Sequence, residues 1–382
     1  MARRFVAVIG AVIALVAVVL PVQDASATTW SSRSLGRTPF TCSDTSLWLY
    51  RSTQVGATVY AAARDKCGHI AFVSGSPTAG YHIERTPFAG YNGHWDLVDA
   101  IARDGATTYF VRVNPRYTTH LELWVRTSAA KYVQLRLLTT AGGAGVSRFP
   151  VTAVAAAGGH WAVVWRQFNK YQTLTTYAES TMPGHNGRTE QVTAVASTVS
   201  NSPVGLVATS SSSVKLILAH STSSLVSFLA LQSTTSGWSA GRTLVSAKLT
   251  NGAGANLSAL GVVQHSVTTY LLVYRSTSSA ADLETITDSG STPHRVVVTT
   301  TAASMTAAYA VDPATGYQWI ATVRGTNYDR TDLYSNATGT WRSRALSFGS
   351  DVGLDGLTAY SGKPAVYYSP ASTPQDTVYY AH

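Results

Sequence analysis

The sequence predicts an all-β fold: a seven-bladed β-propeller of four-stranded antiparallel blades, with the last blade closed by the N-terminal strand. Three observations predict it: an arginine that recurs at a near-constant interval, short strand-like runs between successive arginines, and a last repeat that lacks one strand. Four short antiparallel strands repeated every 40 to 50 residues or so are typical of a propeller blade. No segment shows a convincing helical periodicity.

The repeat is visible first in one motif. Trp30–Leu35 matches Trp341–Leu346 position for position, Trp238–Leu244 matches with one extra residue, and Tyr132–Leu138 is a further variant. The arginine of this motif recurs at intervals of 52, 51, 52, 54, 53 and 49 residues, at Arg33, Arg85, Arg136, Arg188, Arg242, Arg295 and Arg344. We expect these arginines on the outermost strands, in a structural role, because a charge there discourages edge pairing.

The unit around Arg295 shows the four strands of one blade, at Leu257–Gln264, Thr269–Arg275, Asp282–Thr287 and His294–Thr300. Turn residues between the first and second strands recur in register along the chain. They are Asp104-Gly105, Gly158-Gly159, the serines at 210 to 213, His265-Ser266, Pro313 to Gly316 and Ser361-Gly362. Such residues are typical of hairpin loops.

The two ends of the chain complete each other. After Arg344 only three strands remain, near Leu357, at Ala365–Tyr368 and at Thr377–Tyr380. The segment Trp30–Leu35 supplies the missing outer strand, which closes the ring and removes its open edges. Six or eight blades remain as alternatives if the short first and last units are misread.

The N-terminus predicts export. Arg3 and Arg4 precede an apolar run from Phe5 to Leu20, and Ala25-Ser26-Ala27 offers the small residues of a cleavage site. We interpret residues 1–27 as a signal peptide and residues 28–382 as one propeller domain, with an N-terminal membrane anchor as the alternative. The mature protein is then expected to be secreted, without an integral membrane segment. In an oxidising compartment Cys42 and Cys67 are expected to form a disulfide, and we expect no metal site.

Composition narrows the class of function. Only 12% of the residues are charged, against about 25% in an ordinary soluble domain, and 45% are hydrophobic, which excludes a disordered chain. The formal net charge is +9, but the arginines are spread by the repeat instead of clustered. Together with export, this spread argues against nucleic acid as the partner.

The segment Ser335–Trp341 looks like a decayed Asp-box, the turn that marks sialidase blades, with Ala337 where the aspartate belongs. At the level of the repeat pattern, the mature chain resembles secreted bacterial seven-bladed propellers of the sialidase-like and lectin-like kind. That resemblance implies a carbohydrate ligand. A sialidase would also need converging arginines and a tyrosine nucleophile assisted by a glutamate, and the arginine motif of that family is not recognisable here.

A second series marks the end of the second strand in each blade, at Arg64, Arg112, Arg166, His220, Arg275, Arg324 and Ser369. These strand ends point to the upper face, which we define as the face that carries the loops between strands two and three and between blades. Guanidinium groups there suit carboxylate or phosphate groups. The alternative is cross-strand ion pairing, of Arg275 with Asp282 and of Arg324 with Asp332.

Loops of the upper face combine amides, aromatic rings and bases, a mixture suited to sugars. The predicted ligand-binding residues are Tyr91, Asn92, His94, Arg112, Asn114, Arg116, Tyr117, Arg166, Asn169, Tyr171, Arg275, Arg324, Asn327 and Tyr328. The favoured function is a secreted, non-catalytic module that binds an extracellular polymer. That polymer is a glycan or another cell-envelope or extracellular polymer, anionic ones included, and we expect no cofactor. A diverged sialidase-like glycoside hydrolase is the alternative, and its catalytic residues cannot be assigned from the sequence.

Overall fold

The fold is described from a computed structural model. It describes residues 29–88, 97–113, 121–138, 152–168, 174–185, 187–192, 200–222, 225–248, 256–276, 281–301, 305–324, 330–349, 352–370 and 377–382. Within these ranges the chain forms strands and turns, with no helix among them, and therefore no helix long and apolar enough to cross a membrane.

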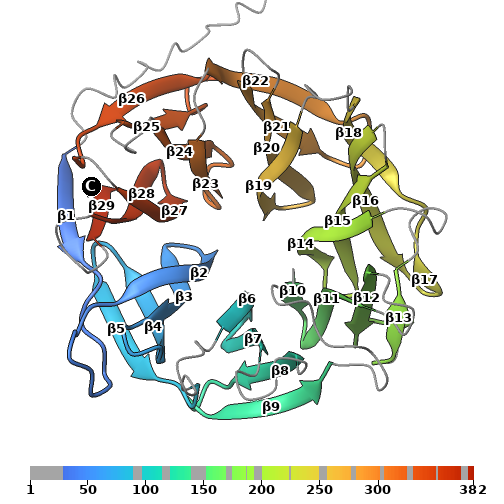
Figure 1. The fold of residues 1–382 in the computed structure, drawn as a ribbon, viewed down its shortest axis with the longest axis horizontal. Helices are drawn as coiled ribbons and strands as arrows, with labels where there is room; N and C mark the ends of the chain where they lie inside the picture. Colours follow the sequence, from blue (N-terminus) through green and yellow to red (C-terminus); the bar gives the residue numbers. More distant parts are fainter. Residues whose placement is uncertain are drawn as a thin grey trace, which may run out of the picture.

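Seven antiparallel sheets stand in a ring around a central axis, which confirms the predicted seven-bladed propeller (Figure 1). Blade 1 contains β2 (Trp48–Val55), β3 (Thr58–Arg64), β4 (Ile70–Ser76) and β5 (Gly80–Arg85). Blade 2 contains β6 (Leu97–Asp104), β7 (Thr107–Val113), β8 (Leu121–Arg126) and β9 (Tyr132–Leu137). Blade 3 contains β10 (Thr152–Ala157), β11 (His160–Phe168), β12 (Leu174–Ser180) and β13 (Thr189–Gln191).

The remaining blades follow in chain order around the ring. Blade 4 contains β14 (Ser200–Ser210), β15 (Ser213–Ser221), β16 (Leu225–Thr234), β17 (Gly237–Trp238) and β18 (Arg242–Lys248). Blade 5 contains β19 (Asn256–His265), β20 (Thr268–Ser276), β21 (Ala281–Asp288) and β22 (His294–Thr301). Blade 6 contains β23 (Met305–Val311), β24 (Gln318–Arg324), β25 (Arg330–Ser335) and β26 (Arg342–Leu346). Blade 7 contains β27 (Gly353–Tyr360), β28 (Lys363–Ser369), β29 (Thr377–Ala381) and, from the other end of the chain, β1 (Trp30–Ser34).

The ring closes as predicted. β1 lies antiparallel beside β29, with Trp30 opposite Ala381 and Ser34 opposite Thr377. The rings of Trp30 and Tyr379 stack with centroids 4.8 Å apart, which adds an aromatic contact between β1 and β29. The N-terminal strand is thus the outermost strand of blade 7 (Figure 1).

Blade 4 departs from the simple repeat. Its outer strand is divided into β17 and β18, both of which pair with β16, with Ser239, Ala240 and Gly241 between them. This break falls within the Trp238–Leu244 motif, whose extra residue distinguishes it from the other copies. An extra residue interrupts the ladder because two residues then face one on the partner strand.

Seven hydrophobic clusters hold the ring together, and each is shared by two neighbouring blades. Because both faces of a blade are covered, its middle strands are apolar along most of their length, as β7 and β15 are. The packing between neighbouring blades therefore holds the ring together. A site built from two blades would lie at one of these interfaces.

The predicted disulfide is confirmed between Cys42 and Cys67, whose Cα atoms are 6.0 Å apart. It ties the segment before β2 to the loop after β3. Asp65 lies beside the two sulfurs, but its carboxylate already accepts hydrogen bonds from Thr38 Oγ1 at 2.9 Å and from the backbone N–H of His69 at 2.9 Å. Both sulfurs are bonded to each other, so this group stabilises the loop and has no thiolate to offer a metal.

Candidate functional site

The first strands of all seven blades surround a central cavity of about 560 Å³. Its walls carry Ser52, Ile101, Ala155, Val207, Val263, Ala310 and Leu357, one per blade, together with the polar side chains of Gln54, Arg103 and Gln264. Internal hydrogen bonds engage these three: Gln54 donates to the carbonyl of Ala359, Arg103 to Thr108 and Gln264 to the carbonyl of Ser266.

The predicted loop residues cannot be placed. Tyr91, Asn92, His94, Asn114, Arg116, Tyr117, Asn169, Tyr171, Asn327 and Tyr328 all lie outside the described residues. Four predicted residues, Arg112, Arg166, Arg275 and Arg324, are described and lie at or near the ends of second strands, as expected. Their role in ligand binding stays a prediction.

Three of these arginines, Arg112, Arg275 and Arg324, form ion pairs with carboxylates of the same chain. Arg324 pairs with Asp332 at 2.7 Å, as the cross-strand alternative predicts, and Arg112 pairs with Glu122 at 3.2 Å. The fourth, Arg166, is half-buried, and burial lowers the pKa of its guanidinium. Strand geometry explains the pairs, because residues on one face of adjacent strands lie within reach of each other.

The predicted pair between Arg275 and Asp282 is wrong. Arg275 bonds Glu284 instead, with Nε 3.0 Å from Oε1, while Asp282 accepts a hydrogen bond from Thr300 at 2.7 Å. Glu284 is fully buried and Asp282 lies at the edge of the sheet. A buried carboxylate needs charged partners far more than an exposed one does, and Glu284 takes a second guanidinium from Arg295.

The outer-strand arginines form bonds between blades. Arg33 of blade 7 donates to the carbonyl of Thr78 in blade 1 at 3.3 Å, and Arg136 of blade 2 donates to Glu179 in blade 3 at 2.5 Å. The guanidinium of Arg344 in blade 6 lies 5.0 Å from the ring centroid of Trp30 in blade 7. Six of the seven lie on outer strands, and Arg188 precedes β13 by one residue. Their structural role is thus carried in part by contacts to the next blade.

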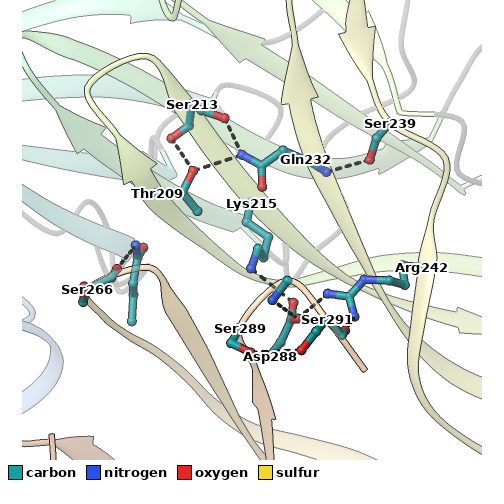
Figure 2. Close-up of polar contacts among 12 residues, drawn as sticks. Thr209, Ser213, Lys215, Gln232, Ser239, Arg242, Ser266, Asp288, Ser289 and Ser291 are labelled. Carbon is teal, nitrogen blue, oxygen red and sulfur yellow. Dashed lines mark hydrogen bonds and ion pairs between the residues drawn. The ribbon is translucent and has the colours of Figure 1, made fainter. Parts of the chain in front are cut away.

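Side chains of blade 4 also bond to blade 5, where their partner is a buried carboxylate (Figure 2). Asp288 accepts hydrogen bonds from Lys215 Nζ at 3.1 Å and from Arg242, both of blade 4. Burial alone would raise the pKa of Asp288, but Arg242, the Gly290 N–H and Lys215 together lower it. Nearby, Gln232 binds Thr209, Ser213 and Ser239, so the polar groups in this view satisfy one another.

A pocket at the outer rim, between blades 1 and 2, has a different character. It is an open hollow of about 580 Å³ lined by Glu84, Arg85, Thr86, Pro87, Trp124, Ala130 and Tyr132. β5 and the residues after it form one wall, while β8, β9 and their connecting turn form the other.

Aromatic packing fixes the inner wall of this pocket. Phe88 is fully buried and makes edge-to-face contacts with Phe110, Trp124 and Tyr132 at centroid distances of 5.8, 5.4 and 5.9 Å. The guanidinium of Arg112 lies 5.1 Å from the Phe88 ring. Rings held in this way lose little conformational freedom when a ligand contacts them.

Charged groups complete the pocket. Arg126 of blade 2 grips Glu84 of blade 1, with Nη2 2.6 Å from Oε2 and Nε 3.1 Å from Oε1. Burial alone would raise the pKa of Glu84, but Arg126 and Tyr132 lower it, so Glu84 is ionised at neutral pH. Arg85 is exposed, and it donates from Nε to the carbonyl of Pro39 at 2.7 Å. Arg85 pairs with Ala71 whereas Glu84 pairs with Phe72, so the two side chains leave β5 on opposite faces. The Arg85 guanidinium lies 5.5 Å from the ring centroid of Phe40, away from the pocket.

Tyr132 and Glu84 are the described pair that most resembles a tyrosine nucleophile with its glutamate. Burial first, and the neighbouring Glu84 second, raise the pKa of Tyr132 far above its usual value. A hydroxyl that holds its proton this strongly is a poor nucleophile. The chain has five glutamates, and four are ion-paired with arginines: Glu84 with Arg126, Glu122 with Arg112, Glu179 with Arg136 and Glu284 with two arginines. The fifth, Glu190, lies 3.0 Å from Nδ1 of His185.

The residues of the rim pocket were not among the candidates predicted from the sequence. Two signals could have indicated them. Tyr132 occupies the position of the tryptophan in the repeated outer-strand motif, and Glu84 directly precedes the repeat arginine Arg85. Their meeting depends on the packing of blade 1 against blade 2, because Glu84 and Arg126 are separated by 42 residues.

No protein-family model matches the chain, and no curated protein matches its sequence. Among solved structures, a puromycin hydrolase mutant is 12% identical with a TM-score of 0.53, over 86% of this chain and 53% of its own. AofleA from Arthrobotrys oligospora is 12% identical with a TM-score of 0.45, over 84% and 90%. A mutant of Aleuria aurantia lectin in complex with alpha-methyl-L-fucoside is 9% identical with a TM-score of 0.39, over 91% and 89%.

These similarities concern the fold alone. The chain spans about half the length of the puromycin hydrolase that it matches. A propeller fold by itself does not choose between catalysis and binding. That choice has to come from the chemistry of the sites.

Proposed function

We propose that this chain is a secreted, non-catalytic propeller that binds a glycan, and that the rim pocket between blades 1 and 2 is its sugar site. The observation that supports the proposal is the composition of that pocket, in which two aromatic side chains and a proline lie beside an ionised glutamate. The central cavity has no carboxylate among its lining residues.

Sugars require such a mixture. The C–H faces of a pyranose ring pack against aromatic rings, and its hydroxyls need fixed donors and acceptors. Trp124, Tyr132 and Pro87 supply apolar surface, and Glu84 supplies acceptor oxygens. Thr86 adds a hydroxyl to the wall, but its Oγ1 already donates to the carbonyl of Ile70 at 2.5 Å.

The ligand is proposed to be an extracellular glycan, whose hydroxyl groups would donate to the Glu84 carboxylate. The formal net charge of +9 would also attract a polyanion from a distance. The upper-face loops predicted from the sequence would extend the binding surface for a polymer.

The pocket chemistry disfavours the sialidase-like alternative. Tyr132 keeps its proton because its pKa is raised, and Glu84 is held by Arg126. A retaining or inverting glycosidase needs two carboxyl groups that flank one bond, and the pocket contains a single one.

The test compares variants of two neighbouring residues on β5. Glu84→Gln removes the carboxylate of the pocket at nearly unchanged size, whereas Arg85→Ala removes the neighbouring guanidinium, which lies on the other face of β5 against Phe40. With uronate-containing and neutral polysaccharides on an array, Glu84→Gln should lower affinity about tenfold or more, since a charged hydrogen-bonded contact is lost. Arg85→Ala should bind like the wild type.

Two outcomes would contradict the proposal. The mature protein could bind no neutral or acidic glycan above background, or Glu84→Gln and Arg85→Ala could lower binding equally. Turnover of fluorogenic sialosides or uronides that is lost in Arg112→Ala or Arg324→Ala would favour the hydrolase instead. Thermal unfolding of both variants checks that the fold is intact.

A further inference from the structure

Exposed apolar side chains gather on the lower face of the ring, where the first strand of each blade turns into the second. Among the described residues, four of the eight exposed large hydrophobic side chains lie at these turns. They are Val267 in blade 5, Tyr317 in blade 6, Tyr360 in blade 7 and Val55 in blade 1, with exposed fractions of 66%, 39%, 41% and 51%. Because blades 5, 6, 7 and 1 are consecutive in the closed ring, these side chains form one arc, which we call the apolar crescent.

The other half of the lower face lacks this feature. The corresponding turns of blades 2, 3 and 4 are Gly105-Ala106, Gly158-Gly159 and Ser211-Ser212, and they carry no large apolar side chain. A turn needs no valine or tyrosine for its own geometry, which glycine and serine satisfy. The asymmetry therefore points to a role for the apolar side chains outside the fold.

The crescent is also rigid, because its turns are bonded to one another. Asp312 in blade 6 accepts hydrogen bonds from the N–H groups of Ser361 and Gly362 in blade 7, at 3.1 and 2.5 Å. Gln54 in blade 1 donates to the carbonyl of Ala359 in blade 7 at 2.6 Å. His265 Nε2 lies 3.3 Å from the carbonyl of Pro313, which joins blade 5 to blade 6.

Charge around the crescent favours a negative partner. Lys363 is exposed and lies opposite Tyr360 across the turn of blade 7. The nearby carboxylate of Asp312 is fully buried and accepts hydrogen bonds from backbone N–H groups, so it is not presented at the surface. The formal net charge of the chain is +9.

We propose that the apolar crescent docks on the surface of an anionic lipid bilayer. Tyrosine places its ring at the level of the headgroups with its hydroxyl toward water, and valine side chains enter the edge of the hydrocarbon region. Lys363 then faces lipid phosphates, with which a single lysine gains a modest attraction. A sugar ligand would use the two tyrosines but leave Val55 and Val267 without a counterpart. This site is separate from the rim pocket, so it holds whether or not the pocket binds a glycan.

The experiment measures binding of the full chain to vesicles of phosphatidylcholine, with and without phosphatidylglycerol, by cosedimentation. The triple variant Val267→Ser, Tyr317→Ser, Tyr360→Ser should lower the partition coefficient about tenfold or more, since exposed side chains that are buried in the interface are lost. Lys363→Gln should lower it about fivefold on the anionic vesicles alone.

A matched control is available in the same blade. Val297 lies on the outer strand β22 and is 46% exposed, so Val297→Ser removes an exposed valine of blade 5 that is not part of the crescent. It should bind vesicles like the wild type. Every substituted position is exposed, and thermal unfolding of each variant confirms that it folds.

The proposal is overturned if the wild type does not sediment with anionic vesicles, or if Val297→Ser loses as much binding as the triple variant. It is also overturned if the wild type is a dimer that the triple variant converts to a monomer without any vesicle binding, because the crescent would then be an interface between two copies of this chain. Glycan binding that persists in the triple variant separates this result from the proposed sugar site.

Discussion

The interface between blades 1 and 2 and the interface between blades 4 and 5 both pack two sheets together, but they do so with different kinds of side chain. The first buries Phe72, Phe88 and Phe110, with Trp124 and Tyr132 partly buried against them. The second is built almost entirely from aliphatic side chains, among them Ile217, Leu271 and Ile286, with Phe228 as its one buried aromatic ring. The backbone repeat is common to both, so the difference lies in the side chains alone.

Charge is also placed differently in the two interfaces. Between blades 1 and 2, guanidinium groups lie over aromatic rings, as Arg103 does 3.8 Å from the ring centroid of Tyr60 and Arg126 does 4.7 Å from that of Phe72. Between blades 4 and 5, Lys215 and Arg242 converge on the buried carboxylate of Asp288 (Figure 2). The rim pocket lies beside the rings of the aromatic interface. Two interfaces of the same fold can thus carry different surface chemistry.

The largest expected effect breaks the aromatic interface. Phe88→Ala should lower the free energy of unfolding by about 5 kcal/mol, because it leaves a cavity and removes three ring contacts. Phe228→Ala in the other interface makes the same chemical change without a described ring contact and should cost about 3 kcal/mol. Denaturant unfolding measures both. Equal losses would mean that the ring contacts add nothing beyond buried area.

The next effect concerns the buried carboxylate of the aliphatic interface. Asp288→Asn should lower the free energy of unfolding at neutral pH by about 3 kcal/mol, because it leaves the nearly buried Lys215 without its counterion. Phe88→Ala and Asp288→Asn lie in separate interfaces, so their effects should add in the double variant.

The pH dependence of this effect follows from the lowered pKa of Asp288. A carboxylate with a lowered pKa in the folded state stabilises the fold above its unfolded pKa of about 4, and this contribution is lost as the pH falls through the lowered value. The wild type and Asp288→Asn should therefore differ most at neutral pH and converge below about pH 4. A difference that stays constant from neutral to acidic pH would show that the charge of Asp288 is not its cause.

The sequence predicts the strands well because turns and apolar runs are local signals. The four strands expected around Arg295 agree with β19 to β22 within one residue at each end. The closing strand was also predictable, since a last repeat with three strands leaves one partner missing. Where the rule broke, as in the divided outer strand of blade 4, a single extra residue in the motif was the cause.

Side-chain partners were harder to predict because they depend on depth and on the neighbouring blade. Spacing alone could not decide that Arg275 bonds the buried Glu284 in preference to the edge residue Asp282. Spacing also could not bring Glu84 to Arg126, which come from different blades. A repeat of about 51 residues gives the order of the blades, whereas the contacts between them follow from how the sheets pack.

The smallest expected effect compares the two uses of arginine. Arg103→Lys keeps the positive charge but loses the planar group that lies over Tyr60, and it should cost about 1 kcal/mol. Arg242→Lys keeps a charge beside Asp288, where Lys215 already serves, and should cost about half as much. The two should also differ in salt dependence, measured by thermal unfolding at low and high ionic strength. The exposed charge of Arg242 is screened by salt, whereas the stacked guanidinium of Arg103 is partly shielded from it, so only Arg242→Lys should approach the wild type as salt rises. If the ranking of the two costs were reversed, ion pairing and not stacking would be the stronger link between blades.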